Sequence, residues 1–298
     1  MSDAEAFETF KAIRWVKNEG KPFCPRCGCV SVYTYTKRCI FKCKGCEAQF
    51  SVTTDTIFAS HKLPLRDILA AIAIFVNGAK GHSALQLSRD LDVQYKTAYV
   101  LSHKIREAIS NSMKGETLNG EIEVDGAYFG GYVKPANYKE NRRDRRLLRN
   151  QTGKREVVVV MRQRGGDALT SVFKAEHDSL ATIQSRVANG STIYADDATG
   201  WDALHARYLT KRINHSEAYS HDGACTNQAE SFFSRIRRAE MGIHHHIAGK
   251  YLAAYAAEMS WRENNRRISN GEQYLIATNA ALQAPVSRQW KGYWQRVA

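Results

Sequence analysis

Four cysteines near the start of the chain have the spacing of a metal site. They follow the pattern C-x2-C-x15-C-x2-C and are Cys24, Cys27, Cys43 and Cys46. This spacing places four thiolates around one tetrahedral zinc ion at the tips of two β-turns. Two disulfide bonds are the alternative, but no secretory signal precedes the motif, and Cys29, Cys39 and Cys225 leave an odd total that suits a reducing compartment. The pattern therefore predicts structural Zn²⁺ in a small zinc ribbon.

Acidic residues far apart in the sequence are candidates for a second metal site. Asp125 lies in a segment whose other residues are mostly apolar or small, where a carboxylate is costly unless it binds a metal or a partner. Asp196 and Asp197 directly follow a short apolar run, at the kind of strand end where α/β proteins gather ligands. Glu230 begins a helical pattern and could instead complement the helix dipole. The sequence alone leaves the choice between Asp196 and Asp197 open.

Three such carboxylates would suit phosphodiester chemistry. In-line displacement at a phosphate needs an activated attacking oxygen and a stabilised leaving oxygen, and two divalent ions about 3.5–4 Å apart serve both needs. Mg²⁺ prefers hard oxygen ligands, so carboxylates suit it better than cysteine or histidine. We therefore expect Asp125, Glu230 and either Asp196 or Asp197 to hold two Mg²⁺ ions, for which Mn²⁺ can substitute.

The elements that would bring these acids together belong to one mixed sheet. Alternation and β-branched runs predict strands over residues 121–129, 157–161, 169–174 and 192–195, with a helix over 180–187 before the last. Three strands, a helix and another strand are the order of an RNase H-like domain. Two further helices are predicted over 227–241 and 250–265. In such a fold the first strand, the fourth strand and a following helix converge.

The first half of the chain contains a candidate DNA-reading module. Residues 83–91 and 94–109 have helical patterns separated by a short turn, which is typical of a helix-turn-helix. Such modules read the major groove with the start of the second helix, here Gln94, Tyr95, Lys96 and Thr97. A plain helical hairpin between two domains is the alternative.

Charge also points to a polyanionic partner. The formal net charge is +13, and residues 134–155 contain nine basic and two acidic residues. We expect this insert to settle on phosphates, although a solvated loop would have the same composition. The residues of the insert that we expect to contact phosphates are Arg142, Arg143, Arg145 and Arg146. Arg237 and Arg238, two helical turns beyond Glu230, are further candidates. The longest apolar run has nine residues, too few to span a membrane.

The chain resembles bacterial insertion-sequence transposases of the DDE class that carry an N-terminal zinc ribbon. The resemblance runs in order along nearly the whole chain. The stretches that carry it include Cys24-Pro-Arg-Cys-Gly28, Phe41-Lys-Cys-Lys-Gly-Cys46, Val124-Asp-Gly-Ala-Tyr-Phe-Gly-Gly131, Tyr194-Ala-Asp196, Asn214-His-Ser216 and Thr226-Asn-Gln-Ala-Glu-Ser-Phe-Phe233.

This resemblance implies a DDE triad at Asp125, Asp196 and Glu230, and it selects Asp196 over Asp197. The chain departs from the family pattern at Trp201, where tyrosine is commoner, and at Ala195, where threonine is usual. We expect neither residue to touch a proposed ligand. Some relatives use another third residue, so Glu230 has the weakest support of the three.

The resulting expectation is a multidomain α+β protein. It would comprise an N-terminal helix and zinc ribbon (1–60), a helix-turn-helix (61–115), an RNase H-like catalytic domain with the basic insert (116–268) and a tail (269–298). It would bind double-stranded DNA at the inverted repeats of a mobile element, cleave it and join it to target DNA as a homodimer or larger assembly. A cytoplasmic, nucleoid-associated location follows. A silent regulatory DNA-binding derivative and a structure-specific nuclease are the alternatives.

Overall fold

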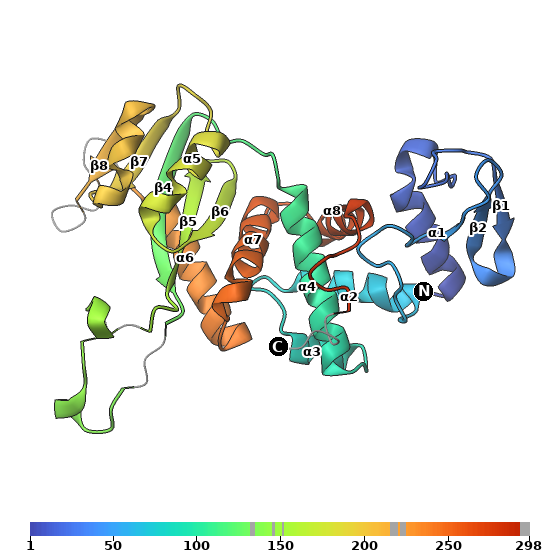
Figure 1. Cartoon of the computed structure of the whole chain (residues 1–298), viewed down its shortest axis with the longest axis horizontal. Helices are drawn as coiled ribbons and strands as arrows, with labels where there is room; N and C mark the ends of the chain where they lie inside the picture. The colour runs from blue at the N-terminus through green and yellow to red at the C-terminus, as the bar shows by residue number, and fades with distance from the viewer. Residues whose placement is uncertain (132–134, 145–146, 151, 215–219, 221–224, 293–298) are drawn as a thin grey trace. The chain divides into compact units, whose positions relative to one another are not determined.

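The computed structural model describes residues 1–131, 135–144, 147–150, 152–214, 220 and 225–292. The chain forms two compact units (Figure 1). Met1–Lys114 and Arg267–Ala298 make up the first unit, and Gly115–Arg266 makes up the second. Within the described part of the chain, no helix combines the length and the apolar character needed to cross a bilayer.

The first unit begins with a helix and a small antiparallel sheet. Helix α1 (Asp3–Arg14) starts at a capping box in which Ser2 and Glu5 exchange hydrogen bonds. The sheet has the order β1-β2-β3, with β1 at Val32–Tyr35, β2 at Ile40–Cys43 and β3 at Gln49–Ser51. Aromatic rings fill its core: the ring of Phe41 lies 5.5 Å from that of Trp15 and 5.4 Å from that of Phe50. Such a small sheet gains little from apolar burial, which is why it needs further support.

Four helices complete the first unit. They are α2 (Leu65–Asn77), α3 (Ala84–Asp90), α4 (Tyr95–Ser112) and α8 (Asn270–Gln283). Helices α3 and α4 lie where the two helices of the helix-turn-helix were predicted. Between them Asp92 has a φ of 50°, in the left-handed region that a sharp turn requires. Helix α8, from the unassigned tail, packs against α2 and α4.

The second unit is built on a five-stranded mixed sheet of order β6-β5-β4-β7-β8. Its strands are β4 (Glu121–Phe129), β5 (Glu156–Gln163), β6 (Ala168–Phe173), β7 (Thr192–Asp196) and β8 (Leu209–Ile213). β4, β5 and β6 pair antiparallel, whereas β4, β7 and β8 pair parallel. This is the RNase H-like arrangement predicted from the strand order, with β8 as an edge strand that the sequence analysis missed.

Helices cover both faces of this sheet (Figure 1). One face, which includes Ile122, Val124 and Ile193, packs with α5 (Leu180–Arg186) and the 3-10 segment Thr199–Ala206. The opposite face, which includes Ala127 and Phe129, packs with α6 (Asn227–Ala239) and α7 (Gly249–Asn265). Because side chains alternate along β4, Asp125 shares the face of Ala127, toward α6.

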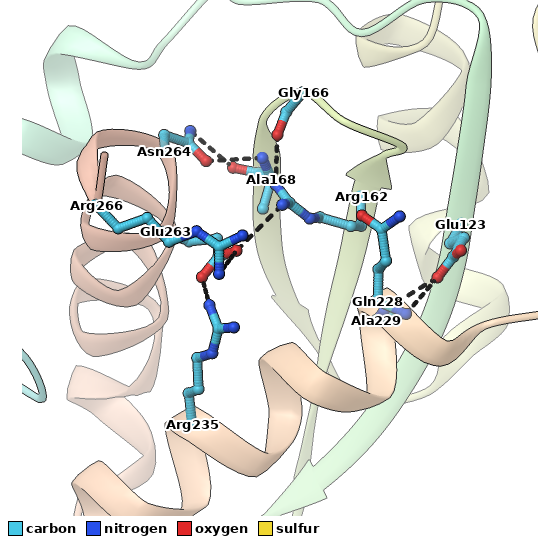
Figure 2. A network of polar contacts seen from close by, with 10 residues as sticks. All are labelled: Glu123, Arg162, Gly166, Ala168, Gln228, Ala229, Arg235, Glu263, Asn264 and Arg266. Atoms are coloured by element: carbon cyan, nitrogen blue, oxygen red, sulfur yellow. Dashed lines mark hydrogen bonds and ion pairs between the residues drawn. The ribbon is translucent and has the colours of Figure 1, made fainter. Parts of the chain in front are cut away.

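Polar contacts fix α7 to the sheet and to α6 (Figure 2). Glu263 of α7 forms ion pairs with Arg162 of β5, at 3.1 Å, and with Arg235 of α6. The side-chain amide of Asn264 donates to the carbonyl of Ala168 and accepts from its N–H, as a further strand would. Both Arg162 and Glu263 are buried, so this ion pair has to be well bonded to offset its desolvation.

Candidate functional site

The four cysteines of the ribbon come together as a metal-binding group. Their Sγ atoms all lie within 4.8 Å of one another, with the Cys24–Cys46 and Cys27–Cys43 pairs at 3.6 Å. Sulfur atoms on a tetrahedral zinc ion with bonds of about 2.3 Å stand about 3.8 Å apart, so the donor set fits Zn²⁺. Backbone N–H groups of Cys46 and Gly45 donate to Cys43 Sγ and lower the pKa of that thiol, which favours the thiolate that zinc binds.

None of the seven cysteines forms a disulfide. The prediction of a structural zinc site instead of two disulfide bonds agrees with this arrangement.

Asp125 is the central acid of the second unit. The pairing of Glu123 with Tyr194 in the parallel β4–β7 register places Asp125 and Asp196, each two residues further on, at the same level of the sheet. The pKa of Asp125 is raised to about 7, first by burial and then by the negative charges of Asp196, Glu230 and Glu176. The N–H of Gly126 donates to Asp125 Oδ1 at 2.7 Å, and this hydrogen bond lowers the pKa of Asp125.

Asp196 ends β7 and is held by its surroundings. The indole N–H of the fully buried Trp201 donates to Asp196 Oδ1 at 2.7 Å. Arg212 of β8 donates to the backbone carbonyl oxygens of Asp196 and Ala198 at 2.5 and 2.6 Å, which fixes the turn after the strand. The expectation that Trp201 touches no proposed ligand was therefore wrong: its ring reaches the carboxylate from the 3-10 segment that packs under β7. Asp197, the alternative acid, is exposed.

Glu230 lies in the first turn of α6 with an exposed side chain. Its charge contributes to the raised pKa of Asp125, so it lies within electrostatic range of that carboxylate. Among the residues that the structure describes, however, only the four cysteines bring three or more ligand atoms within 4.8 Å of one another. The three acids therefore surround one region without forming the compact shell of a single ion.

A fourth carboxylate, Glu176, was missed by the sequence analysis. It begins the 3-10 segment Glu176–Ser179 after β6. Burial and the charge of Asp196 raise its pKa, and Arg155 lowers it. A Cβ atom at Gly126 would lie 2.7 Å from Glu176 Oε1, so the glycine beside Asp125 makes room for this side chain.

Glu123 was missed as well. It lies two residues before Asp125 on β4, is buried, and accepts hydrogen bonds from the backbone N–H groups of Gln228 and Ala229 at the start of α6 (Figure 2). The sequence analysis assigns Glu123 no role, although this residue lies in the segment that contains Asp125.

The predicted DNA-contacting residues lie at the surface where the structure describes them. Gln94, Tyr95 and Lys96 are exposed at the start of α4, and Thr97 is partly buried. Arg142 and Arg143 are exposed in the insert, and Arg237 and Arg238 are exposed in the last turn of α6. Arg145 and Arg146 lie outside the described residues. Exposure leaves the described side chains able to contact a partner, and it does not identify one.

Comparison with known proteins gives matches over both units. The family described as transposase zinc-ribbon domain matches residues 1–49, and the family described as ISXO2-like transposase domain matches residues 117–264. An uncharacterized protein in transposable element ISH50 of Halobacterium salinarum is 26% identical over 295 residues, which are 95% of this chain and 98% of the relative.

A solved structure, the crystal structure of the Mos1 strand transfer complex, is 12% identical and covers 75% of this chain and 76% of its own. Its TM-score of 0.27 is too low to inform the fold, which rests on the strand order instead. The two family matches contain all four cysteines and the three candidate acids. The chain belongs to the ISXO2-like transposases that carry an N-terminal transposase zinc ribbon.

Proposed function

We propose that this transposase cleaves DNA at the ends of a mobile element and joins the freed ends to target DNA, with Asp125, Asp196 and Glu230 holding two Mg²⁺ ions. The observation that carries the proposal is the concentration of negative charge around Asp125. A half-buried strand carboxylate with a pKa of about 7 and three other carboxylates in range is unfavourable in the metal-free protein. Divalent cations would relieve this repulsion.

The donor set fits magnesium. All donors are carboxylate oxygens, which Mg²⁺ prefers, and two ions about 3.5–4 Å apart do not require all three acids within the coordination range of one. Asp125, whose pKa is raised by the charges of both Asp196 and Glu230, would be one of these ligands. When bound, the ions would activate an attacking oxygen and stabilise a leaving oxygen at phosphorus.

Neighbouring groups of the protein prepare this site. Trp201 orients the carboxylate of Asp196, and Gly126 holds that of Asp125 through its N–H. Because burial favours the protonated form of Asp125, its carboxylate is fully available as a ligand only above about pH 7. The site therefore binds cations in competition with protons.

DNA recognition is assigned to the basic and exposed surfaces. Gln94, Tyr95, Lys96 and Thr97 would read bases of terminal inverted repeats, as the start of a recognition helix does. The phosphate backbone would be held by the arginines Arg142, Arg143, Arg145, Arg146, Arg237 and Arg238. The net charge of +13 supports a polyanionic partner. Since two element ends must be joined, we expect at least a dimer on DNA.

The test uses purified, zinc-loaded protein and a plasmid that carries the DNA flanking its own coding region. With Mg²⁺ or Mn²⁺ we expect nicking at the element ends and, with labelled 3′ ends, joining to a second plasmid. Asp125→Asn should abolish both while changing DNA binding by no more than a few-fold, because it removes a metal ligand and no base contact. Exposed Asp197→Asn is the matched control and should retain activity. Cleavage without joining would instead favour a nuclease, and binding without cleavage a regulator.

A further inference from the structure

Glu123 is an acid buried in the interior of the second unit. Its side chain is 1% exposed, and it precedes Asp125 by two residues on β4. The alternation of the strand places both carboxylates on the face that α6 covers. A carboxylate in this position must be fully bonded, because an unpaired buried charge is strongly unfavourable.

The partners of Glu123 are at the start of the helix that carries Glu230. Its Oε2 accepts from the backbone N–H groups of Gln228, at 2.8 Å, and Ala229, at 3.1 Å (Figure 2). Its Oε1 accepts from Arg164 Nε at 3.0 Å. The first N–H groups of a helix have no partner within the helix, and they attract negative charge. Glu123 therefore caps α6 from the strand that carries Asp125.

The capped residues directly precede Glu230, whose own N–H donates to the carbonyl of Thr226 at 2.9 Å as the first step of the helical ladder. Five residues beyond Glu230 along α6, Arg235 pairs with Glu263 of α7. These two polar contacts add to the apolar packing of α6 on the sheet, to which Ala229 and Phe232 contribute. Loss of the contact with Glu123 would weaken the attachment of the first turn of α6, so its backbone amides would open more often.

We infer that Glu123 is a positioning residue, which sets the place of Glu230 relative to Asp125 by tying the first turn of α6 to β4. The inference rests on the proposed metal site for its functional consequence, but the mechanical link itself does not depend on metal. It assigns to the strand two acids with different tasks: Asp125 faces the ions, and Glu123 holds the helix that supplies a further ligand.

The first measurement is amide hydrogen exchange of the full chain, with zinc in the ribbon and with no Mg²⁺ or Mn²⁺ added. Glu123→Gln keeps the shape and one acceptor but removes the charge, so amides in residues 226–231 should exchange about tenfold faster, while the last turn of α6 stays unchanged. Glu258→Gln is the matched control. Glu258 is also 1% exposed and pairs with Arg262 at 2.8 Å, but within α7. It should leave the first turn of α6 protected.

The second measurement is Mn²⁺ binding by electron paramagnetic resonance. Glu123→Gln should weaken Mn²⁺ binding about tenfold, and Glu258→Gln should not, even if both lower the melting temperature equally. Unchanged exchange in residues 226–231, or unchanged Mn²⁺ affinity alongside an Asp125→Asn variant that loses it, would overturn the inference. If Asp125→Asn has no effect on Mn²⁺ binding either, the proposed metal site fails and hydrogen exchange alone decides the role of Glu123. Should Glu123→Gln not fold, Glu123→Asp, which is one methylene shorter, is tested in the same way.

Discussion

Asp125→Asn should stabilise the second unit in the absence of Mg²⁺, and the gain should depend on pH in a specific way. The carboxylate is held in a place that favours its protonated form, with a pKa of about 7 against 3.8 for an ordinary aspartate. Asparagine has nearly the same shape, carries no charge, and can still accept the hydrogen bond from Gly126. The substitution therefore removes an electrostatic penalty while keeping the packing.

The sign and size follow from proton linkage. The pKa of Asp125 is higher in the folded than in the unfolded state. The free-energy penalty of its deprotonation is therefore absent below about pH 4, grows between about pH 4 and 7, and reaches its full size above pH 7. Each pH unit in that interval corresponds to about 1.4 kcal/mol, so the full penalty approaches about 4 kcal/mol. For a unit of this size the melting temperature changes by roughly 2–4 °C for each kcal/mol, which gives a gain of roughly 10 °C at pH 8.

The assay is thermal unfolding of zinc-loaded wild type and variant at pH 5, 6, 7 and 8, without Mg²⁺ and without chelator. The advantage of the variant should rise from pH 5 to 7 and level off between pH 7 and 8. Added Mg²⁺ should stabilise the wild type and leave the variant unchanged. Asp197→Asn, which removes the exposed acid beside Asp196, serves as the control and should show no such slope.

A difference in melting temperature between wild type and Asp125→Asn that stays constant from pH 5 to 8 would refute the reasoning. So would a variant less stable than the wild type at pH 8 in the absence of metal, because Asp125 would then be stabilised as a carboxylate by the protein alone.

The remaining predictions concern the residues around the two sites. Cys43→Ser should lose bound zinc and unfold the ribbon, because metal binding supplies the folding energy of such modules; atomic absorption that finds unchanged zinc would contradict this. Trp201→Phe removes the 2.7 Å hydrogen bond to Asp196 and leaves a small cavity in the core, so kcat for cleavage should fall about tenfold with about 2–3 kcal/mol lost in unfolding free energy; an unchanged kcat would show that Asp196 needs no such support. Glu176→Gln removes a charge that raises the pKa of Asp125, so the acidic limb of the cleavage pH profile should move to lower pH, and a move to higher pH would count against the assignment.

The central strands and helices of the second unit could be predicted because their patterns of apolar and β-branched residues indicate which positions are buried. Residues 121–129 form β4 as expected, and the β-branched run at 157–161 lies within β5. Strand β8 could not be recognised in the same way. It is an edge strand whose interior residues, Lys211 and Arg212, are polar, and only the pairing with β7 makes it a strand.

Helix α8 shows a second limit of sequence reasoning. Its start is marked by a capping box between Ser269 and Glu272, a signal that was present in the sequence. Its buried positions include several alanines, which give almost no hydrophobic periodicity, so the packing against α2 and α4 could not be read locally. Trp290, from the same tail, is buried with its ring 4.5 Å from that of His103.

Residues of the candidate site could be predicted where an acid differs from its apolar neighbours in the sequence. They could not be predicted where only the tertiary structure brings a residue to the site. Asp125 interrupts a buried strand, and Asp196 ends one. Glu176 lies in a short 3-10 segment where an acid is common, and Trp201 reaches Asp196 only because the segment after β7 folds under the sheet. These contacts depend on tertiary structure, for which local sequence holds no signal.

The return of α8 to the N-terminal unit affects how the protein can be made. The sheet domain has all its strands and helices once residue Arg266 has left the ribosome, whereas the preceding unit still lacks Arg267–Ala298. The second unit can therefore be complete during synthesis while the first still lacks its last helix, although domains usually fold from the N-terminus onward. A chain that a nonsense mutation ends just after Arg266 would contain a complete sheet domain and an unfinished helical one, with the apolar faces of α2 and α4 exposed to proteases and chaperones.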